Sequence, residues 1–302
     1  MLPDISKANI EVLHDELFIQ KQVTVSVLRL DKIHPVISGN KLFKLHYFLE
    51  EALAAKQDTI LTFGGAYSNH LAATAFVCKA LHLKSIAVVR GEKPAVLSST
   101  LQQCVKNGMK LKFISRELYA QKDQVVLFEE LKNELSNCMI VPEGGYAPAG
   151  AKGAALIMDL IKYNSYTHIC TASGTATTTA GLLLAVKPGQ IVVSLPVLKG
   201  MTDNKTRIKE LTGNTDDFKN LLILDDYHFG GYAKKTSELI DFMNDCWEKY
   251  KLPLDFVYTA KMLYGIIDSI KKDRFEKGSK ILCVHTGGLQ GNKSLPLKSL
   301  LF

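Results

Sequence analysis

The stretch Thr167-His168-Ile169-Cys170-Thr171-Ala172-Ser173-Gly174-Thr175-Ala176-Thr177-Thr178 indicates the fold most clearly. Its first five residues predict a short buried strand, its middle is a turn of small residues, and a helical pattern then continues to about Val186. The same order of apolar strand, polar turn and helix recurs along most of the chain. Such alternation is typical of a parallel sheet that is covered by helices on both faces.

Working outward from this stretch, periodicity predicts the other strands and helices. Strands are expected at 23–30, 59–63, 84–89, 111–114, 139–141, 190–195, 220–224 and 280–284. Helices are expected at 42–56, 70–81, 98–107, 120–135, 150–163, 203–211, 232–250 and 260–272. Ligands of parallel sheets bind at the carboxyl ends of strands, and the Gly-, Ser- and Thr-rich turns of this chain follow strands. We therefore expect one site that is assembled from several turns.

Composition favours a soluble, cytoplasmic protein. The 302 residues carry a net charge of +7, but the lysines are dispersed, so nucleic-acid binding is not expected. No signal peptide pattern and no apolar run of membrane-spanning length occurs in the sequence. The six cysteines show neither a CxxC pair nor metal-ligand spacing, which predicts buried free thiols in a reducing compartment and no metal site.

Lys41 is the first candidate for catalysis. It lies in Gly39-Asn40-Lys41-Leu42-Phe43-Lys44-Leu45, where an irregular segment meets the start of a helical pattern. The N-terminus of a helix carries partial positive charge, which would push an adjacent ammonium toward its neutral, nucleophilic form. Taken alone, however, this heptapeptide favours an ordinary surface lysine, since most lysines are exposed.

The turn Ser173–Thr178 is the candidate anion site. Small residues let successive backbone N–H groups converge at a helix N-terminus, which suits a phosphate monoester. A nucleotide P-loop requires a lysine, and this turn has none. The dinucleotide pattern G-x-G-x-x-G is also missing. The alternative is an ordinary strand-to-helix turn.

Three further turns hold polar side chains, each with an ordinary alternative. Ser68 alone is more often a helix N-cap than a nucleophile, and no G-x-S-x-G elbow surrounds it. His70 alone would be a routine histidine on a helix surface. Thr259 alone would cap the helix that follows Tyr258, and the turn at His285 lacks the glycine pattern of a Walker loop.

In combination, these turns resemble the 1-aminocyclopropane-1-carboxylate deaminase/D-cysteine desulfhydrase family, pyridoxal-phosphate enzymes of fold type II related to the tryptophan synthase β subunit. The resemblance extends from about Leu28 to Leu289, and five motifs in the family's order make it specific: Gly39-Asn40-Lys41-x-x-Lys44-Leu45, Gly65-x-x-Ser68-Asn69-His70, Pro142-Glu143-Gly144-Gly145, Tyr258-Thr259-x-Lys261-Met262 and His285-Thr286-Gly287-Gly288. It implies an α/β fold with two open, twisted, mostly parallel sheets, helices on both faces and pyridoxal 5'-phosphate in the cleft between them. The implied domains are a large cofactor-binding domain, 1–45 and 138–302, and a small domain, 46–137.

The resemblance also implies roles for residues in the first two motifs. Lys41 would bond covalently to the cofactor and then transfer protons once substrate has displaced it. Lys44, on the same helical face, would lower the pKa of Lys41 or help to hold an anionic group. Asn69 would approach O3′ of the cofactor. Ser68, Asn69 and His70 would bind the substrate carboxylate, and Ser68 would also take part in proton transfer.

The phosphate would be held by the turn Thr175-Ala176-Thr177-Thr178. Here the chain departs from the family, because Ala176 and Thr177 stand where two glycines are usual. Both residues need backbone angles that glycine adopts more readily, and the threonine hydroxyls would compensate for a less favourable amide geometry.

Thr259 and Thr286 favour one branch of this family. Deaminases that open the cyclopropane ring have a glutamate after the tyrosine, close to the pyridine nitrogen, and an apolar residue in place of Thr286. A carboxylate keeps the pyridine protonated and makes it the strong electron sink that ring opening needs, which hydroxyls cannot do. The pattern therefore resembles the desulfhydrase branch, with Tyr258 facing the substrate and Tyr232 as a second active-site phenol.

The sequence thus predicts a pyridoxal-phosphate-dependent lyase that acts on a small amino acid, with D-cysteine, giving pyruvate, sulfide and ammonia, as the first candidate substrate. The ring-opening deaminase is the alternative within the same chemistry, and a racemase would share the scaffold. Two alternatives belong to other classes. A non-catalytic pyridoxal-phosphate-binding protein would also need Lys41, whereas a nicotinamide-dependent dehydrogenase is disfavoured because the dinucleotide-binding pattern is missing from this sequence. A homodimer is expected from the family alone.

Overall fold

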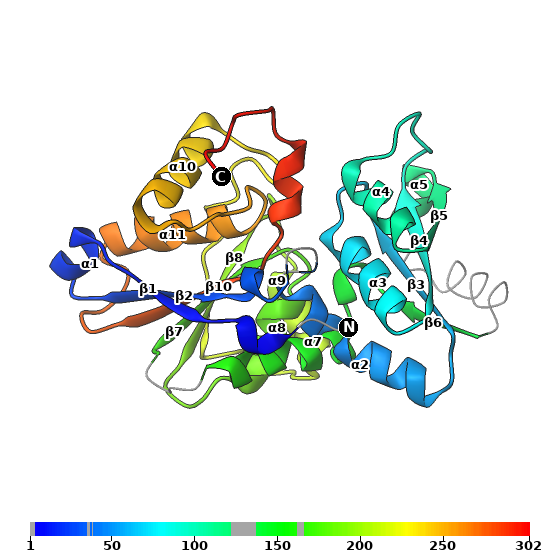
Figure 1. Ribbon diagram of the computed structural model, residues 1–302. Coiled ribbons are helices and arrows are strands. Elements are labelled where there is room, and N and C mark those ends of the chain that lie inside the picture. The colour runs from blue at the N-terminus through cyan, green and yellow to red at the C-terminus, as the bar shows by residue number, and fades with distance from the viewer. Residues whose placement is uncertain (1–3, 35–36, 38, 122–136, 162–165) are drawn as a thin grey trace.

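The structure, a computed structural model, describes residues 4–34, 37, 39–121, 137–161 and 166–302. They form two separate sheets, each with helices packed against it (Figure 1). The six-stranded sheet has the order β1-β2-β10-β7-β8-β9, and the four-stranded sheet has the order β5-β4-β3-β6. All neighbouring strands are parallel except β1 and β2. The expectation of two mostly parallel sheets with helices on both faces is confirmed.

The six-stranded sheet has a buried core on each face. Its strands are β1 (Ile10–Leu13), β2 (Thr24–Arg29), β7 (His168–Ser173), β8 (Ile191–Pro196), β9 (Leu221–Ile223) and β10 (Lys280–His285). Along β7, Cys170 packs toward helices α10 (Ser237–Tyr250) and α11 (Thr259–Lys271). The adjacent Ile169 packs toward α7 (Pro148–Ala155) and α8 (Thr177–Ala185), because successive side chains of a strand point to opposite faces. The remaining helices of this part are α1 (Glu16–Gln20) and α9 (Asn204–Thr212).

The four-stranded sheet is built in the same way. Its strands are β3 (Thr59–Gly64), β4 (Lys84–Arg90), β5 (Met109–Ile114) and β6 (Cys138–Val141), and its helices are α2 (Lys41–Ala54), α3 (Asn69–Ala80), α4 (Ser99–Lys106) and α5 (Arg116–Ala120). Every residue of β3 is buried, as expected for a central strand that is covered on both faces. Leu61 and Phe63 pack on one face with Tyr119, and Ile60 packs on the other with α2 and α3.

The expected domain boundary at residue 138 differs from the strand pairing. β6 begins at Cys138 and pairs with β3, so it belongs to the four-stranded sheet and not to the larger part of the chain. The pairing follows from residue type, since Met139 to Val141 is a short apolar strand that completes the buried face around Ile60.

Two expected helices also differ in length. The helix expected at 232–250 begins at Ser237, because Ala233 has a positive φ angle that an α-helix excludes, and Thr236 caps the helix instead. The helix expected at 150–163 begins at Pro148 and becomes a 3₁₀ segment, Leu156–Leu160. Most of the helix expected at 120–135 lies outside the described residues.

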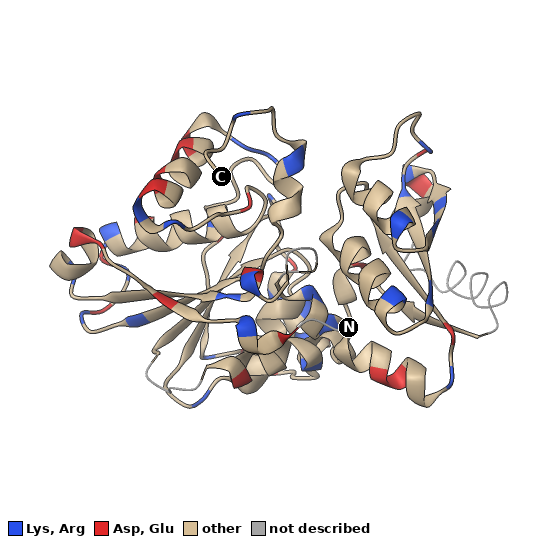
Figure 2. Ribbon diagram, in the orientation of Figure 1, with Lys and Arg blue, Asp and Glu red and all other residues tan. Residues whose placement is uncertain are grey.

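Charged side chains are dispersed over both parts of the molecule (Figure 2). Within the described ranges, no helix has the length and apolar character that crossing a membrane requires. The same residues contain no group of three or more His, Cys, Asp or Glu side chains arranged to hold a metal ion.

Candidate active site

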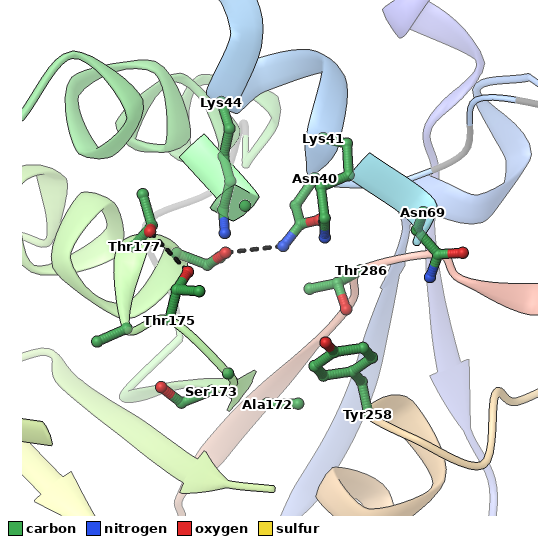
Figure 3. A pocket seen from close by; sticks show the side chains of 15 residues that line it. Asn40, Lys41, Lys44, Asn69, Ala172, Ser173, Thr175, Thr177, Tyr258 and Thr286 are labelled. Atoms are coloured by element: carbon green, nitrogen blue, oxygen red, sulfur yellow. Dashed lines mark hydrogen bonds between the residues drawn. The ribbon is translucent and has the colours of Figure 1, made fainter. Parts of the chain in front are cut away.

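A pocket lies between the two sheets, at the carboxyl ends of their strands. It opens between the first turns of α2, α3 and α8 and the turns that follow β7 and β10 (Figure 3). Its lining comes from both parts of the chain, which fits a site in a cleft. The lining residues are Asn40, Lys41, Lys44, Asn69, Gly144, Ala172, Ser173, Gly174, Thr175, Ala176, Thr177, Thr178, Tyr258, Thr286 and Gly287.

The segment Gly39–Lys41 joins α2 to the turn after β10. Gly39 has a φ of +87°, and a Cβ built on it would lie only 1.8 Å from the Thr286 carbonyl oxygen. The Asn40 backbone N–H donates to that same oxygen over 3.2 Å. The Asn40 amide then links both walls, because its Nδ2 donates to Thr178 Oγ1 at 2.7 Å and its Oδ1 accepts from Lys41 Nζ at 2.7 Å. Lys41 is therefore fixed at the first turn of α2, as expected.

The electrostatics of the two lysines follow from burial. Burial lowers the pKa of Lys41 to about 8, opposed by the negative charge of Asp255. Burial and the neighbouring charge of Lys41 lower the pKa of Lys44 well below its ordinary value. The charge of Lys41 thus lowers the pKa of Lys44, whereas the sequence suggested that Lys44 would lower the pKa of Lys41. The outcome for Lys41 is the expected one, an amine that is partly neutral near pH 7.

The turn after β7 forms a cup at the N-terminus of α8. Ala176 adopts a left-handed conformation with a φ of 61°, the kind of backbone angle that glycine would adopt more easily. The hydroxyls of Thr175 and Thr177 share a hydrogen bond of 2.8 Å. The Ser173 Oγ is buried and has no hydrogen-bond partner among the described residues. A cup of hydroxyls at a helix N-terminus, with no acidic side chain, suits an anion.

Tyr258 forms one wall, with its ring 5.9 Å from Lys41 Nζ. Burial raises its pKa well above the ordinary value, so the phenol is protonated at neutral pH. A Cβ on Gly174 would lie 3.1 Å from the Tyr258 ring, so only glycine leaves the space between this ring and the cup open.

Thr259 does not line the pocket. Its side chain is fully buried, and its Oγ1 donates to Asp255 Oδ1 at 2.8 Å and accepts from the Asp255 N–H at 2.8 Å. The Asp255 carboxylate also accepts from the N–H groups of Val257, Tyr258 and Thr259, so Asp255 caps α11, a role that the sequence suggested for Thr259. Thr286, by contrast, does line the pocket.

The other expected site residues surround the pocket without all lining it. Asn69 lines it, and its Oδ1 is buried without a partner among the described residues. Ser68 caps α3 by accepting the Leu71 N–H at 3.3 Å. His70 is buried outside the pocket lining, and its Nε2 shares a 2.9 Å hydrogen bond with Thr62. Burial and the charges of Lys41 and Lys44 lower the pKa of His70 to about 3, which keeps it neutral.

Tyr232 stands beside Tyr258, with ring centroids 6.2 Å apart, but it is 46% exposed and lies outside the pocket lining. Although the side chain as a whole is half exposed, neighbouring groups surround its hydroxyl, and this desolvation raises the pKa of the phenol. The lining residues for which the sequence predicted no role are Asn40, Gly144, Ala172 and Gly287, and Asp255, which binds Thr259, was not predicted either. Their place in the sequence could have indicated a role in the site, because each lies within or close to one of the motifs or turns described above.

Comparison with known proteins agrees with this geometry. Residues 17–287 match the family described as "Pyridoxal-phosphate dependent enzyme". A protein of Pyrococcus horikoshii that is named provisionally as a 1-aminocyclopropane-1-carboxylate deaminase is 33% identical over 275 residues, which cover 84% of this chain and 81% of that protein. A mitochondrial protein of Arabidopsis thaliana is 29% identical over 280 residues, which cover 84% of this chain and 70% of that protein. That protein is named as a bifunctional D-cysteine desulfhydrase/1-aminocyclopropane-1-carboxylate deaminase.

Solved structures show the same fold. A crystal structure described as an ACC deaminase homologue aligns with a TM-score of 0.78 and 28% identity, covering 96% of this chain and 93% of that chain. A hydrogen sulfide-producing enzyme from Fusobacterium nucleatum aligns with a TM-score of 0.69 over 95% of this chain and 97% of that chain, but at 14% identity it shares the fold alone. The chain is a pyridoxal-phosphate-dependent enzyme and belongs to the 1-aminocyclopropane-1-carboxylate deaminase/D-cysteine desulfhydrase family.

Proposed function

We propose that this enzyme catalyses β-elimination from D-cysteine, which yields sulfide, ammonia and pyruvate. The observation that carries the proposal is that no Asp or Glu occurs among the residues described as lining the pocket. Ring opening of a cyclopropane needs a strong electron sink, which a carboxylate at the pyridine nitrogen maintains. Thr286 offers a hydroxyl to the pocket instead, and the Asp255 carboxylate is already engaged by α11 and Thr259.

The residues that are present fit pyridoxal phosphate. The phosphate would be held by the cup at the start of α8, where Ala176 takes the left-handed turn and the Ser173 hydroxyl has no other partner among the described residues. The aldehyde would meet Lys41, whose lowered pKa makes it a competent nucleophile. The orphaned Asn69 Oδ1 marks a further polar contact within the same pocket. Bound there, the cofactor supplies the electron sink for the Cα–H bond that is broken.

The chain's own groups would divide the proton transfers between them. Lys41 in its neutral form can accept the proton from the substrate Cα, because its Nζ lies in the pocket and is only partly protonated near pH 7. Tyr258 keeps its proton at neutral pH and so offers a hydroxyl hydrogen-bond donor to the departing sulfur. Asn40 holds the Lys41 amine in place by accepting its hydrogen bond.

The lowered pKa of Lys41 predicts the pH dependence of cofactor attachment. Only the neutral amine attacks an aldehyde, so the rate at which the apo-protein turns yellow with pyridoxal phosphate should rise with pH and level off above about 8. Stopped-flow absorbance at pH 6 to 10.5 measures this rate. A rate that keeps rising to about pH 10.4, the ordinary lysine value, would contradict the assigned environment of Lys41.

A paired substrate assay tests the proposed reaction. We expect sulfide and pyruvate from D-cysteine at a kcat/KM at least about 100-fold above that for 2-oxobutanoate from 1-aminocyclopropane-1-carboxylate, because an elimination with a good leaving group needs the weaker electron sink. L-Cysteine serves as the stereochemical control. The names of the relatives favour the ring-opening deaminase as the alternative. Release of 2-oxobutanoate alone would establish that alternative and refute the desulfhydrase proposal.

The organisation of the molecule remains part of this proposal. We infer two domains around the two sheets, with β6 in the smaller one, on the strength of the strand pairing. A homodimer and a cytoplasmic location stay expectations from the family and from composition. Sedimentation of the purified holoenzyme measures the first, and fractionation of the cells that produce it measures the second.

A further inference from the structure

Lys261 is a buried lysine for which the proposed chemistry has no use. It lies in the first turn of α11, its side chain is 0% exposed, and it is absent from the pocket lining. Its Nζ donates to two backbone carbonyl oxygens, those of His228 at 2.8 Å and Gly231 at 2.7 Å. Burying a lysine amine is costly, and here two carbonyl oxygens and the negative charge of Asp255 offset that cost.

The two carbonyls belong to a strained turn. The φ angles of Phe229, Gly230, Gly231 and Ala233 are 50°, 88°, 118° and 53°, all in the region that ordinary L-residues avoid. Within this turn the Gly231 N–H donates to the His228 carbonyl, and the Lys234 N–H donates to the Gly231 carbonyl. Lys261 therefore joins both hydrogen-bonded corners of the turn to α11.

Other contacts attach the same segment further along α11. Tyr227 donates its hydroxyl proton to Asp268 over 2.6 Å, and the rings of Phe229 and Tyr264 are 4.9 Å apart. Lys261 differs from these anchors in position. It holds Gly231, the residue immediately before Tyr232, and it lies three residues after Tyr258 on the same helix. One side chain thus connects the backbones that carry both phenols.

We propose that Lys261 is a positioning residue that holds the 228–233 turn on α11 and thereby keeps Tyr232 against Tyr258 at the pocket. The role of the two phenols in turnover rests on the proposed function, whereas the attachment of the turn does not. Burial lowers the pKa of Lys261 to about 8. The neutral amine still has two N–H groups, so both carbonyls keep a donor on either side of this pKa.

Limited trypsin digestion tests the attachment directly. Lys234 and Lys235 are exposed in the segment that follows the turn, and cleavage after either requires local opening. With the holoenzyme, we expect Lys261→Met to speed this cleavage about tenfold, which corresponds to the loss of roughly one or two hydrogen bonds. Lys271→Met, which removes an exposed lysine from the other end of α11, should leave the rate unchanged. Equal cleavage of Lys261→Met and wild-type protein would overturn the proposal.

If Lys261→Met does not fold, Lys261→Gln takes its place, because a shorter amide keeps a donor in the same direction. Its cleavage rate should still exceed that of the Lys271→Met control. Rates equal to the control would overturn the proposal here as well.

A double-mutant cycle with Tyr232→Phe separates positioning from general destabilisation. We expect Lys261→Met to lower kcat about tenfold in the wild-type background but less than about twofold in the Tyr232→Phe background, with the yellow absorbance unchanged in all variants. Equal losses in both backgrounds would refute action through Tyr232. Failure of the proposed function would appear differently, as absence of product from wild-type enzyme alongside an intact trypsin result.

Discussion

Lys41→Ala should abolish the yellow absorbance of the purified protein and lower product formation at least about 10³-fold. The side chain serves two functions in the proposed reaction, as the covalent attachment for the cofactor aldehyde and as the base for the substrate Cα proton. Its pKa of about 8 suits both, since an ordinary lysine would be almost entirely protonated near pH 7. Absorbance spectra after dialysis against pyridoxal phosphate, together with the paired product assay, measure the loss.

Lys44→Met is the matched control for this variant. Lys44 lies one turn further along α2, is 5% exposed and lines the same pocket, but its pKa is lowered partly by the charge of Lys41. Removing it should weaken cofactor affinity while the yellow absorbance still forms at saturating pyridoxal phosphate. If Lys41→Ala kept its colour and Lys44→Met lost it, the two lysines would have to exchange their assigned roles.

The fold could be predicted from the sequence because its signals are local. A buried strand such as Thr59–Gly64 is a short, mostly apolar run that can be recognised without its partner, and it ends at a turn of small and polar residues. The association of β6 with the smaller sheet could not be predicted in this way. It depends on pairing with β3, about 80 residues earlier in the chain, and short strands carry no signal for their neighbours.

The candidate site also contains residues that local sequence identifies and residues whose roles depend on their partners in the fold. Lys41, Asn69 and Thr175–Thr178 line the pocket because each stands where a helix begins after a turn, and sequence position alone indicates that. His70 and Thr259 stand in equally suggestive positions, yet their side chains bond to Thr62 and Asp255. Those partners, eight residues before His70 and four residues before Thr259, decide which way each side chain points, and residue type alone does not reveal the pairing. Lys261 is the extreme case, because its partners lie about 30 residues away on an irregular turn.

Gly39→Ala should destabilise the protein by about 3 kcal/mol or more, and it should also impair cofactor binding. Two costs combine at this position. The φ of +87° disfavours any side chain, and the added Cβ would overlap the Thr286 carbonyl oxygen at 1.8 Å. Relief requires α2 to move away from the turn after β10, and this movement would break the 3.2 Å hydrogen bond from the Asn40 N–H to the same oxygen. Urea unfolding of the apo-protein measures the first effect.

Gly108→Ala separates the two costs. Gly108 has a similar φ of +89°, but no atom lies within 4 Å of the position that its Cβ would occupy, so it carries the backbone cost of about 1 kcal/mol without the overlap. Ligand binding raises the apparent stability of the native state, so pyridoxal phosphate should raise the Tm of wild-type and Gly108→Ala protein equally. The rise should be smaller in Gly39→Ala, because Asn40 and Lys41 move with α2. Equal rises in all three proteins would mean that the contact between Gly39 and Thr286 supports the fold but does not hold Lys41 in register with the phosphate cup.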